Sequence, residues 1–340
     1  MMGSIAATIS ESTREEELPV KAVTYSEFGP PEVLSVREVA RPTPKPDEVL
    51  VRVHATTVTR AETLMRRGSP RWGRLVLGVT RPRKNRRIPG LEFAGEIEAA
   101  GADVRRFAAG DQVFGFAGFH LGACAEYVCL PESASLERKP AGIGFEEAAA
   151  AVDGPSTALY FLRDKAHVRS GRHVLVNGAS GSIGTAAVQL AKHLGAEVTA
   201  VCSPRNADLV TDLGADHVVD YHTEDFTAHH ETYDVIFDTV TATSFARCRR
   251  ALTPRGCYVP TTGLINWPLG AWTALRGGRT VRPGMSVEKQ GALAYVKELI
   301  ESDGFRIVVD RNFPLDRIVD AHRYVDLGHK VGNVTVTVNG

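Results

Sequence analysis

The sequence is short of cysteine, of net charge and of long apolar runs, and each shortage excludes a class of protein. Five cysteines in 340 residues are too few and too scattered for a disulfide framework, which favours a reducing, cytoplasmic compartment. The 40 Lys and Arg residues are balanced by 40 Asp and Glu residues, whereas a protein that grips nucleic acid usually carries a basic excess. No run of about 18 apolar residues occurs, so we expect no membrane span.

The N-terminal residues lack the basic start and the apolar core of a secretory signal. Their Ser, Thr and Glu content predicts a short disordered tail over residues 1–18. At about 150 residues per domain, the remaining length predicts two domains.

Two kinds of hydrophobic pattern divide the rest of the chain. Residues 19–152 contain short strands bounded by glycine, a spacing typical of a partly open barrel. From residue 171, apolar strands alternate with amphipathic helices, which predicts a parallel sheet with right-handed crossovers. The alternating part is expected to contain strands at 173–176, 197–201, 217–220, 233–238 and 257–262 and helices at 183–194, 205–213 and 244–252. The last part is expected to contain helices at 289–301 and 318–327 and strands at 306–309 and 334–338.

A glycine-rich turn joins the first strand and helix of the alternating part. Small residues let the backbone approach a pyrophosphate closely, and the helix N-terminus supplies N–H groups and a partial positive charge. Because the turn stands between a strand and a helix, it predicts a dinucleotide-binding Rossmann domain, with an unliganded glycine turn as the alternative. The residues of this phosphate-binding loop are Gly178, Ala179, Ser180, Gly181, Ser182, Ile183 and Gly184.

The end of the second strand predicts which dinucleotide binds. NAD-preferring sites usually place Asp or Glu there for the ribose hydroxyls, but residues 201–206 contain neither. Ser203 and Arg205 stand there instead, and a guanidinium attracts the 2′-phosphate that a carboxylate would repel. We therefore expect NADPH, with a merely solvated Arg205 as the alternative.

Several motifs spread over residues 20–340 together resemble one family. They are KAV at 21–23, GPPEVL at 29–34, PGLEFAG at 89–95, GDQVFG at 110–115, the loop at 178–184, LGAD at 213–216 and GNV at 332–334. In combination they resemble the zinc-free quinone oxidoreductase-like branch of the medium-chain dehydrogenase/reductase superfamily. The resemblance implies an α/β fold with two domains. A GroES-like catalytic domain would be built from residues 19–152 and 286–340, around a Rossmann NADP-binding domain at 153–285.

The resemblance also implies that no metal is bound. Zinc-dependent relatives carry two ligands at the positions of Thr59 and Leu91 and a third near Asp153. Leucine cannot ligate a metal and threonine is a poor zinc ligand. We expect Thr59 to be the catalytic residue, donating a hydrogen bond to the substrate oxygen. Well-known quinone reductases have an asparagine at this position and a tyrosine at the position of Leu64, so their substrate contacts do not transfer directly.

Further cofactor-binding residues follow from the resemblance. One is a threonine that touches the cofactor, one a tyrosine near the adenosine phosphate, and the others lie beside the nicotinamide or in a C-terminal contacting segment. In chain order they are Thr157, Tyr221, Thr261, Gly263, Lys330, Gly332 and Asn333. For Tyr221, simple packing of the ring is an equally good interpretation.

These observations predict a zinc-independent oxidoreductase that transfers hydride from NADPH to a small quinone or α,β-unsaturated carbonyl compound. A reductase dedicated to one biosynthetic enone or ketone, and a non-catalytic NADPH-binding protein, are the alternatives. A homodimer is expected, because this branch often pairs through the last Rossmann strand, here 280–285.

Two excursions from the regular pattern leave their roles open. The basic segment 66–87 is a lid with Trp72 and Leu75 turned inward, a patch for an anionic partner or a solvated loop. Residues 263–283 wall the substrate pocket or pack on their own domain.

Overall fold

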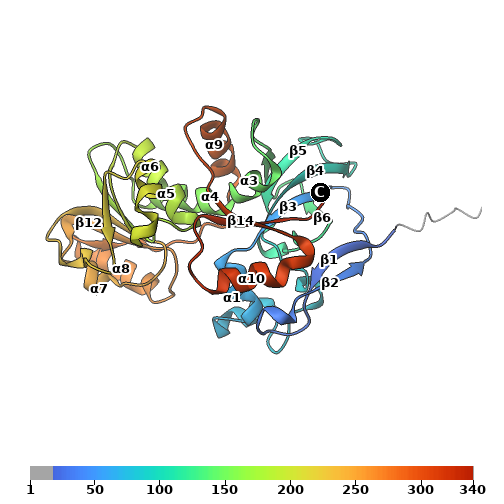
Figure 1. Cartoon of the computed structure of the whole chain (residues 1–340), viewed down its shortest axis with the longest axis horizontal. Helices are drawn as coiled ribbons and strands as arrows, with labels where there is room; N and C mark the ends of the chain where they lie inside the picture. Colours follow the sequence, from blue (N-terminus) through green and yellow to red (C-terminus); the bar gives the residue numbers. More distant parts are fainter. Residues whose placement is uncertain (1–17, 340) are drawn as a thin grey trace, which may run out of the picture.

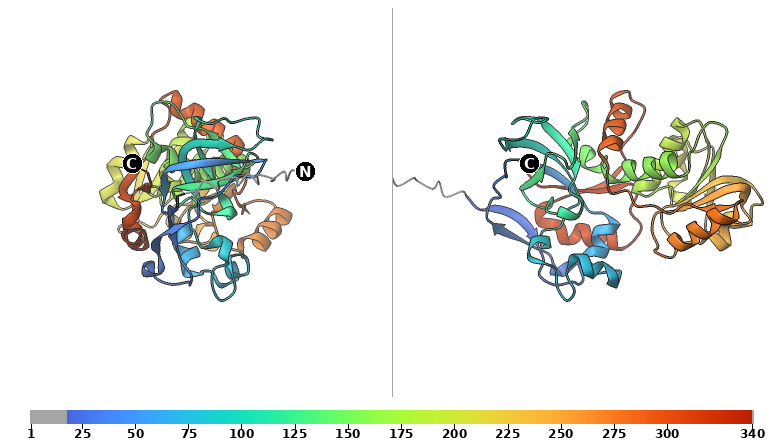
Figure 2. Two further views of the ribbon diagram at one scale, coloured as in Figure 1. Left: turned by 90° about the vertical axis from the view of Figure 1, so that its right-hand side faces the viewer. Right: turned by 180° about the vertical axis from the view of Figure 1, so that it is seen from behind.

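The computed structural model describes residues 18–339, in which two large sheets lie side by side along the long axis (Figure 1). The tail expected over residues 1–18 lies outside the described residues except for Leu18. The right view of Figure 2 also shows the two halves apart, with α9 (Gln290–Glu301) beside their junction. No helix within residues 18–339 has the length and apolar character needed to cross a membrane.

The first sheet has seven mostly antiparallel strands and is built from both ends of the chain. Its order is β14-β15-β3-β4-β5-β7, and β6 also pairs with β3. The two C-terminal strands therefore extend a sheet begun by N-terminal ones, which confirms a GroES-like domain made from both chain ends. The strands are β3 (Glu48–Thr57), β4 (Glu92–Ala100), β5 (Gln112–Phe116), β6 (Tyr127–Pro131), β7 (Ser135–Arg138), β14 (Val309–Pro314) and β15 (Asn333–Thr337).

A hairpin and four helices surround this sheet. The hairpin pairs β1 (Val20–Thr24) with β2 (Ser35–Val39). One contact among the helices is ionic: the guanidinium of Arg66, which is almost fully buried, lies 2.6 Å from Asp326 Oδ2. It fixes α1 to α10 beneath the sheet. The helices are α1 (Arg60–Arg67), α2 (Arg74–Leu77), α3 (Phe145–Ala150) and α10 (Ile318–Asp326).

The second sheet has six parallel strands in the order β10-β9-β8-β11-β12-β13. In its central strand Val174, Leu175 and Val176 are fully buried, because helices cover both faces of a parallel sheet. Strands β9 and β10 are added on one side of β8, and strands β11 to β13 on the other. The boundary between β8 and β11 is therefore a topological switch point, and dinucleotides bind at the carboxyl ends of the strands at such a point. The strands are β8 (His173–Asn177), β9 (Glu197–Cys202), β10 (His217–Asp220), β11 (Tyr233–Asp238), β12 (Leu252–Pro260) and β13 (Thr280–Val281).

The helices of this second domain follow the predicted hydrophobic faces. In α5, Ala187, Leu190 and Ala191 are buried as the sequence periodicity requires. The helices are α4 (Asp153–Leu159), α5 (Ser182–His193), α6 (Ala207–Asp212), α7 (Phe245–Cys248), α8 (Asn266–Arg276) and α9. The prediction placed residues 286–340 in the catalytic domain, but α9 buries Leu293 and Val296 in the same core as the strands of the parallel sheet.

Several predicted element limits are wrong. The strand expected at 306–309 begins only at Val309, because Ile307 and Val308 pack against the core of the parallel sheet instead. The strand expected at 257–262 begins earlier, at Leu252, and shortens the preceding helix to α7. The helix expected at 205–213 starts with a 3-10 turn at Pro204, since proline fixes φ at a first helical position.

Candidate active site

The phosphate-binding loop has the tight geometry that its glycines predict. At Gly184 a Cβ atom would lie 2.1 Å from the carbonyl oxygen of Gly178, so no side chain fits between strand and helix. At Gly181, the N-cap of α5, the nearest such atom would be 3.5 Å away, so the backbone is open toward the end of the helix. The first N–H groups of a helix have no partner within the helix, and glycine carries no side chain that would block access to them. A pyrophosphate can therefore bind to these N–H groups.

A C-terminal segment from the other domain closes over this loop. The N–H of Gly332 donates to the carbonyl oxygen of Ser180 at 2.8 Å, and the Ser182 hydroxyl donates to Asn333 Oδ1 at 2.6 Å. Lys330 Nζ donates to the carbonyl oxygen of Gly332, and burial lowers the pKa of Lys330 to about 8. The structure thus brings together loop and C-terminal residues that the resemblance assigned separately to the cofactor.

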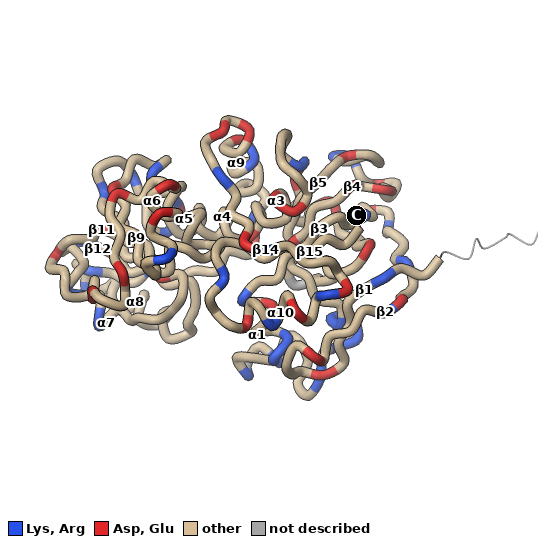
Figure 3. The backbone as a smooth tube through the Cα atoms, viewed as in Figure 1, with Lys and Arg blue, Asp and Glu red and all other residues tan. Residues whose placement is uncertain are grey.

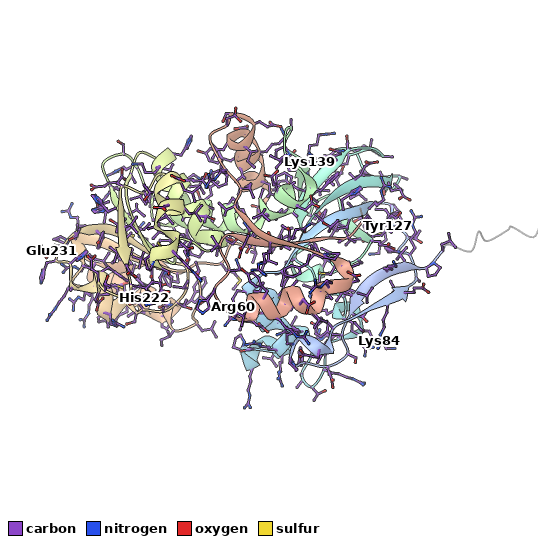
Figure 4. The ribbon with its side chains drawn as sticks, viewed as in Figure 1. Arg60, Lys84, Tyr127, Lys139, His222 and Glu231 are labelled. Carbon is purple, nitrogen blue, oxygen red and sulfur yellow. The ribbon has the colours of Figure 1, made fainter. Side chains whose placement is uncertain are left out.

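The residues expected near the 2′-phosphate lie together at the ends of two neighbouring strands. Cys202 of β9 is paired with Asp220 of β10, so Ser203 and Tyr221 follow at adjacent positions. Tyr221 is 53% exposed, and His222 beside it lies in the Rossmann half (Figure 4). Arg205 is exposed and its Nη2 donates to the carbonyl oxygen of His329 at 3.2 Å, so the side chain folds back toward the C-terminal segment.

Sequence reasoning missed Asn206 in this region. Its side chain is 8% exposed, and its Nδ2 donates to Ser180 Oγ at 3.0 Å. It therefore connects the end of the second strand with the phosphate-binding loop. The only sequence signal was its place directly after Arg205.

The residues expected beside the nicotinamide lie where β8, β11 and β12 end. The Thr261 hydroxyl donates to the carbonyl oxygen of Asp238 at 3.3 Å, and Gly263 has a φ of +100°. The Asp238 carboxylate is fully buried and accepts hydrogen bonds from Asn177 and Tyr258. These bonds hold the ends of the three strands in a fixed arrangement beneath Thr261.

Thr59, which was predicted to be catalytic, also has a structural role. It is the N-cap of α1, where its Oγ1 accepts from the N–H of Glu62 at 3.1 Å. A hydroxyl that accepts through oxygen still carries a hydrogen to donate. Its neighbour Arg60 lies on the side of the catalytic domain that faces the Rossmann domain (Figure 4).

Glu62 completes a capping box with Thr59, in which each residue hydrogen-bonds the backbone N–H of the other. Its carboxylate accepts from the N–H groups of Thr59, at 2.7 Å, and Leu91, at 3.2 Å. Burial raises the pKa of Glu62 to about 7, because the charged form is poorly solvated there. The positions of Thr59 and Leu91 are therefore tied together by one buried carboxyl group.

The positions that hold zinc in metal-dependent relatives do not offer a metal-binding set. Leu91 is buried and packs with Leu77 and Leu121. Asp153 is engaged with Lys289, 2.7 Å from its Nζ. Within residues 18–339, no three His, Cys, Asp or Glu side chains are grouped so that they could hold a metal ion.

Lys289 is the functional candidate that sequence reasoning missed most completely. Its fully buried ammonium donates to the hydroxyls of Thr157 at 2.9 Å and Ser156 at 3.1 Å. The Thr157 hydroxyl in turn donates to Asp153 Oδ1 at 3.0 Å. The lysine precedes a surface helix in the sequence, and no local pattern places it against residues about 130 positions earlier.

The two excursions are partly explained by their contacts. Figure 3 shows Lys and Arg gathered around α1, but Arg66 and Arg67 both pair with Asp326 rather than with solvent alone. Leu75 is 69% exposed, which contradicts the alternative of a lid with Leu75 turned inward. In the other excursion, Leu264, Ile265 and Trp267 are exposed shortly after the end of β12, where the nicotinamide was expected.

Comparison with known proteins places the whole chain among similar oxidoreductases. Residues 45–141 match the family of the alcohol dehydrogenase GroES-like domain, and residues 213–336 match that of the zinc-binding dehydrogenase. The chain is 31% identical to a chloroplastic quinone-oxidoreductase homolog of Spinacia oleracea, over 93% of this chain and 97% of that protein. It is 28% identical to the chloroplastic NADPH-dependent alkenal/one oxidoreductase of Arabidopsis thaliana, over 95% and 81% of the two chains. The solved quinone oxidoreductase of Coxiella burnetii superposes with a TM-score of 0.86 at 30% identity, covering 95% of this chain and 100% of that one.

Proposed function

The chain belongs to the quinone oxidoreductase-like branch of the medium-chain dehydrogenase/reductase superfamily, and from that premise we propose that it reduces quinones or α,β-unsaturated carbonyl compounds with NADPH and without zinc. Similar proteins are named as quinone and alkenal/one oxidoreductases. They support an oxidoreductase of this type that uses a nicotinamide cofactor.

The choice of NADPH rests on the end of β9. No carboxylate occupies residues 201–206, where it would hold the ribose hydroxyls of NAD. Ser203 and Arg205 offer a hydroxyl and a guanidinium to a 2′-phosphate instead. The phosphate-binding loop, with Gly332 and Asn333 closed over it, would hold the pyrophosphate. When bound, NADPH supplies the hydride.

The single observation that carries the choice of acceptor is the buried, apolar Leu91, which stands where metal-dependent relatives carry a zinc ligand. Hydride addition to an isolated carbonyl concentrates charge on one oxygen, which zinc stabilises in metal-dependent relatives by several kcal/mol. One hydroxyl donor such as Thr59 replaces only part of that, because a single oxyanion donor is worth about 2.7–4 kcal/mol. A conjugated acceptor spreads the charge itself and so lowers the demand on the protein.

The test compares an enone with its saturated ketone at equal concentration, following NADPH loss and identifying the product. We expect the enone to be reduced at its C=C bond and the saturated ketone to be inert. Alcohol formed from the ketone at a similar rate would contradict the proposal. Quinone turnover in the same assay separates a general reductase from one dedicated to a single biosynthetic intermediate. Tight NADPH binding without any turnover would identify a non-catalytic binding protein.

We also propose that the protein is a homodimer and that it is located in the cytoplasm. β13 is the edge strand of the parallel sheet, the strand through which members of this branch often pair with a second copy of the chain. All five cysteines are free thiols, which fits a reducing compartment.

A further inference from the structure

The junction of the two domains encloses one ammonium group among oxygens. The Lys289 side chain is fully buried, and its Nζ contacts Asp153 Oδ1 and the hydroxyls of Thr157, Ser156 and Ser286 at 2.7–3.2 Å. The ring of Phe116 covers it, 4.8 Å from Nζ to the centroid. Burial of an ammonium is strongly unfavourable unless it is paired, and these contacts satisfy it.

The hydrogen bonds in this cluster lead from the lysine to one carboxylate. Nζ contacts Asp153 Oδ1 directly at 2.7 Å, and it also donates to Thr157, which donates to the same oxygen. Lys289 is fully buried and Thr157 nearly so, whereas 27% of the Asp153 side chain is exposed. Asp153 is therefore the member of this chain of groups that opens to solvent.

We propose that Lys289 holds the proton that completes reduction of the acceptor and that Asp153 delivers it. The inference rests on the proposed function. Asp153 lies near the position of the third zinc ligand of metal-dependent relatives, and its N–H donates to Glu92 Oε2 at 2.8 Å, one residue from Leu91. Lys289 acts through Asp153, so it is a positioning residue and a proton source rather than a group that touches the acceptor.

The step balances with no additional reactant. The hydride adds to the β-carbon of an enone with both electrons of its bond, and the π electrons move to give an enolate. The proton on Asp153 then passes to the enolate, after an N–H bond of Lys289 has broken to place it there. Lys289 is left as the neutral amine, and solvent restores its proton through the exposed side of Asp153. For a quinone, the same transfer gives the hydroquinone.

The other ionisable groups near this cluster are hydrogen-bonded to other partners. Burial, and then the charge of Asp153, raise the pKa of Glu92 on β4, while its two oxygens accept from Asp153 and Thr57. Glu62 on α1 caps the helix that follows Thr59. Burial lowers the pKa of Lys330, and the charges of Glu92 and Asp153 oppose this shift, but its Nζ donates to the Gly332 carbonyl. Among these groups, Lys289 is the cation that is bonded to Asp153.

The experiment measures kcat for enone reduction as a function of pH in the wild type, K289M and K289Q. Neither variant has a transferable proton at position 289, so only the carboxyl proton of Asp153 remains. We expect kcat at neutral pH to fall about 100-fold or more and to recover as the pH is lowered, while NADPH affinity changes little. S135A is the matched control, because Ser135 Oγ accepts from the backbone N–H of Lys289 and not from its ammonium. It should keep the wild-type profile.

The outcomes separate this inference from the proposed function. If the wild type reduces no acceptor, the proposed function fails. If the wild type turns over and either folded variant keeps its pH profile and kcat, the role of Lys289 is wrong. A fall in kcat that does not recover at low pH would make Lys289 a structural residue only. K289Q retains hydrogen-bonding groups at this position, so it serves if K289M does not fold.

Discussion

Replacing Arg205 with alanine tests how the protein recognises its cofactor. A hydrogen bond between a guanidinium and a phosphate contributes about 1.5–3 kcal/mol. Arg205 is exposed, so solvent screening favours the lower end of this range. A loss of about 1.5 kcal/mol weakens NADPH binding roughly tenfold. NADH lacks the 2′-phosphate, so its affinity should change only through the lost bond to the His329 carbonyl.

The assay is titration of cofactor fluorescence for both dinucleotides, with the wild type, R205A and the control R255A. Arg255 is exposed on β12, and it does not belong to the group of residues at the ends of β9 and β10. We expect R255A to bind both cofactors like the wild type. Equal weakening of NADPH and NADH in R205A would refute the reasoning, because it would show that Arg205 supports the C-terminal segment rather than a phosphate.

Three further predictions follow from the site and the fold. Purified protein should contain far less than one zinc per chain and keep its activity in chelator, because Leu91 offers no ligand; one tightly held zinc per chain would contradict this. Burial raises the pKa of Glu62 from 4.5 to about 7, so between these values the unfolded chain loses a proton that the folded chain keeps, and the free energy of unfolding falls as pH rises. In urea unfolding at about pH 5 and about pH 8, E62Q should lack up to about 3 kcal/mol of this fall, and an unchanged pH dependence would count against a buried protonated Glu62. Light scattering at micromolar concentration should give the mass of a dimer, since β13 is the edge strand of the parallel sheet through which this branch often pairs; a monomer would refute pairing.

The parts of the site that follow from local sequence could be predicted, and those that depend on tertiary approach could not. The loop at 178–184 was recognisable because glycines must stand between a strand and a helix for the backbone to turn so tightly. The closure of Gly332 over Ser180 depended on a resemblance, since no local pattern brings them together. Lys289 gave no signal, because its partners on α4 lie in a different part of the chain.

Element limits failed for a similar reason. The apolar pair Ile307 and Val308 looks like part of a strand, but the neighbouring parallel-sheet core takes up these side chains. β14 then starts at Val309, where pairing with β15 decides its register. Local hydrophobicity identified a segment that packs against a core, and only the fold decided which core that is.

The bond between Ser182 and Asn333 imposes an order of events during biosynthesis. The two residues are 151 positions apart, and a ribosome adding about 5–20 residues per second needs about 8–30 s to make that stretch. All six strands of the parallel sheet end by Val281, so that sheet can form before Asn333 is made. Until Gly332 and Asn333 are made, the phosphate-binding loop of the nascent Rossmann domain lacks its bonds to the C-terminal segment. A chain stalled before residue 332 should therefore have a folded domain that binds its cofactor weakly.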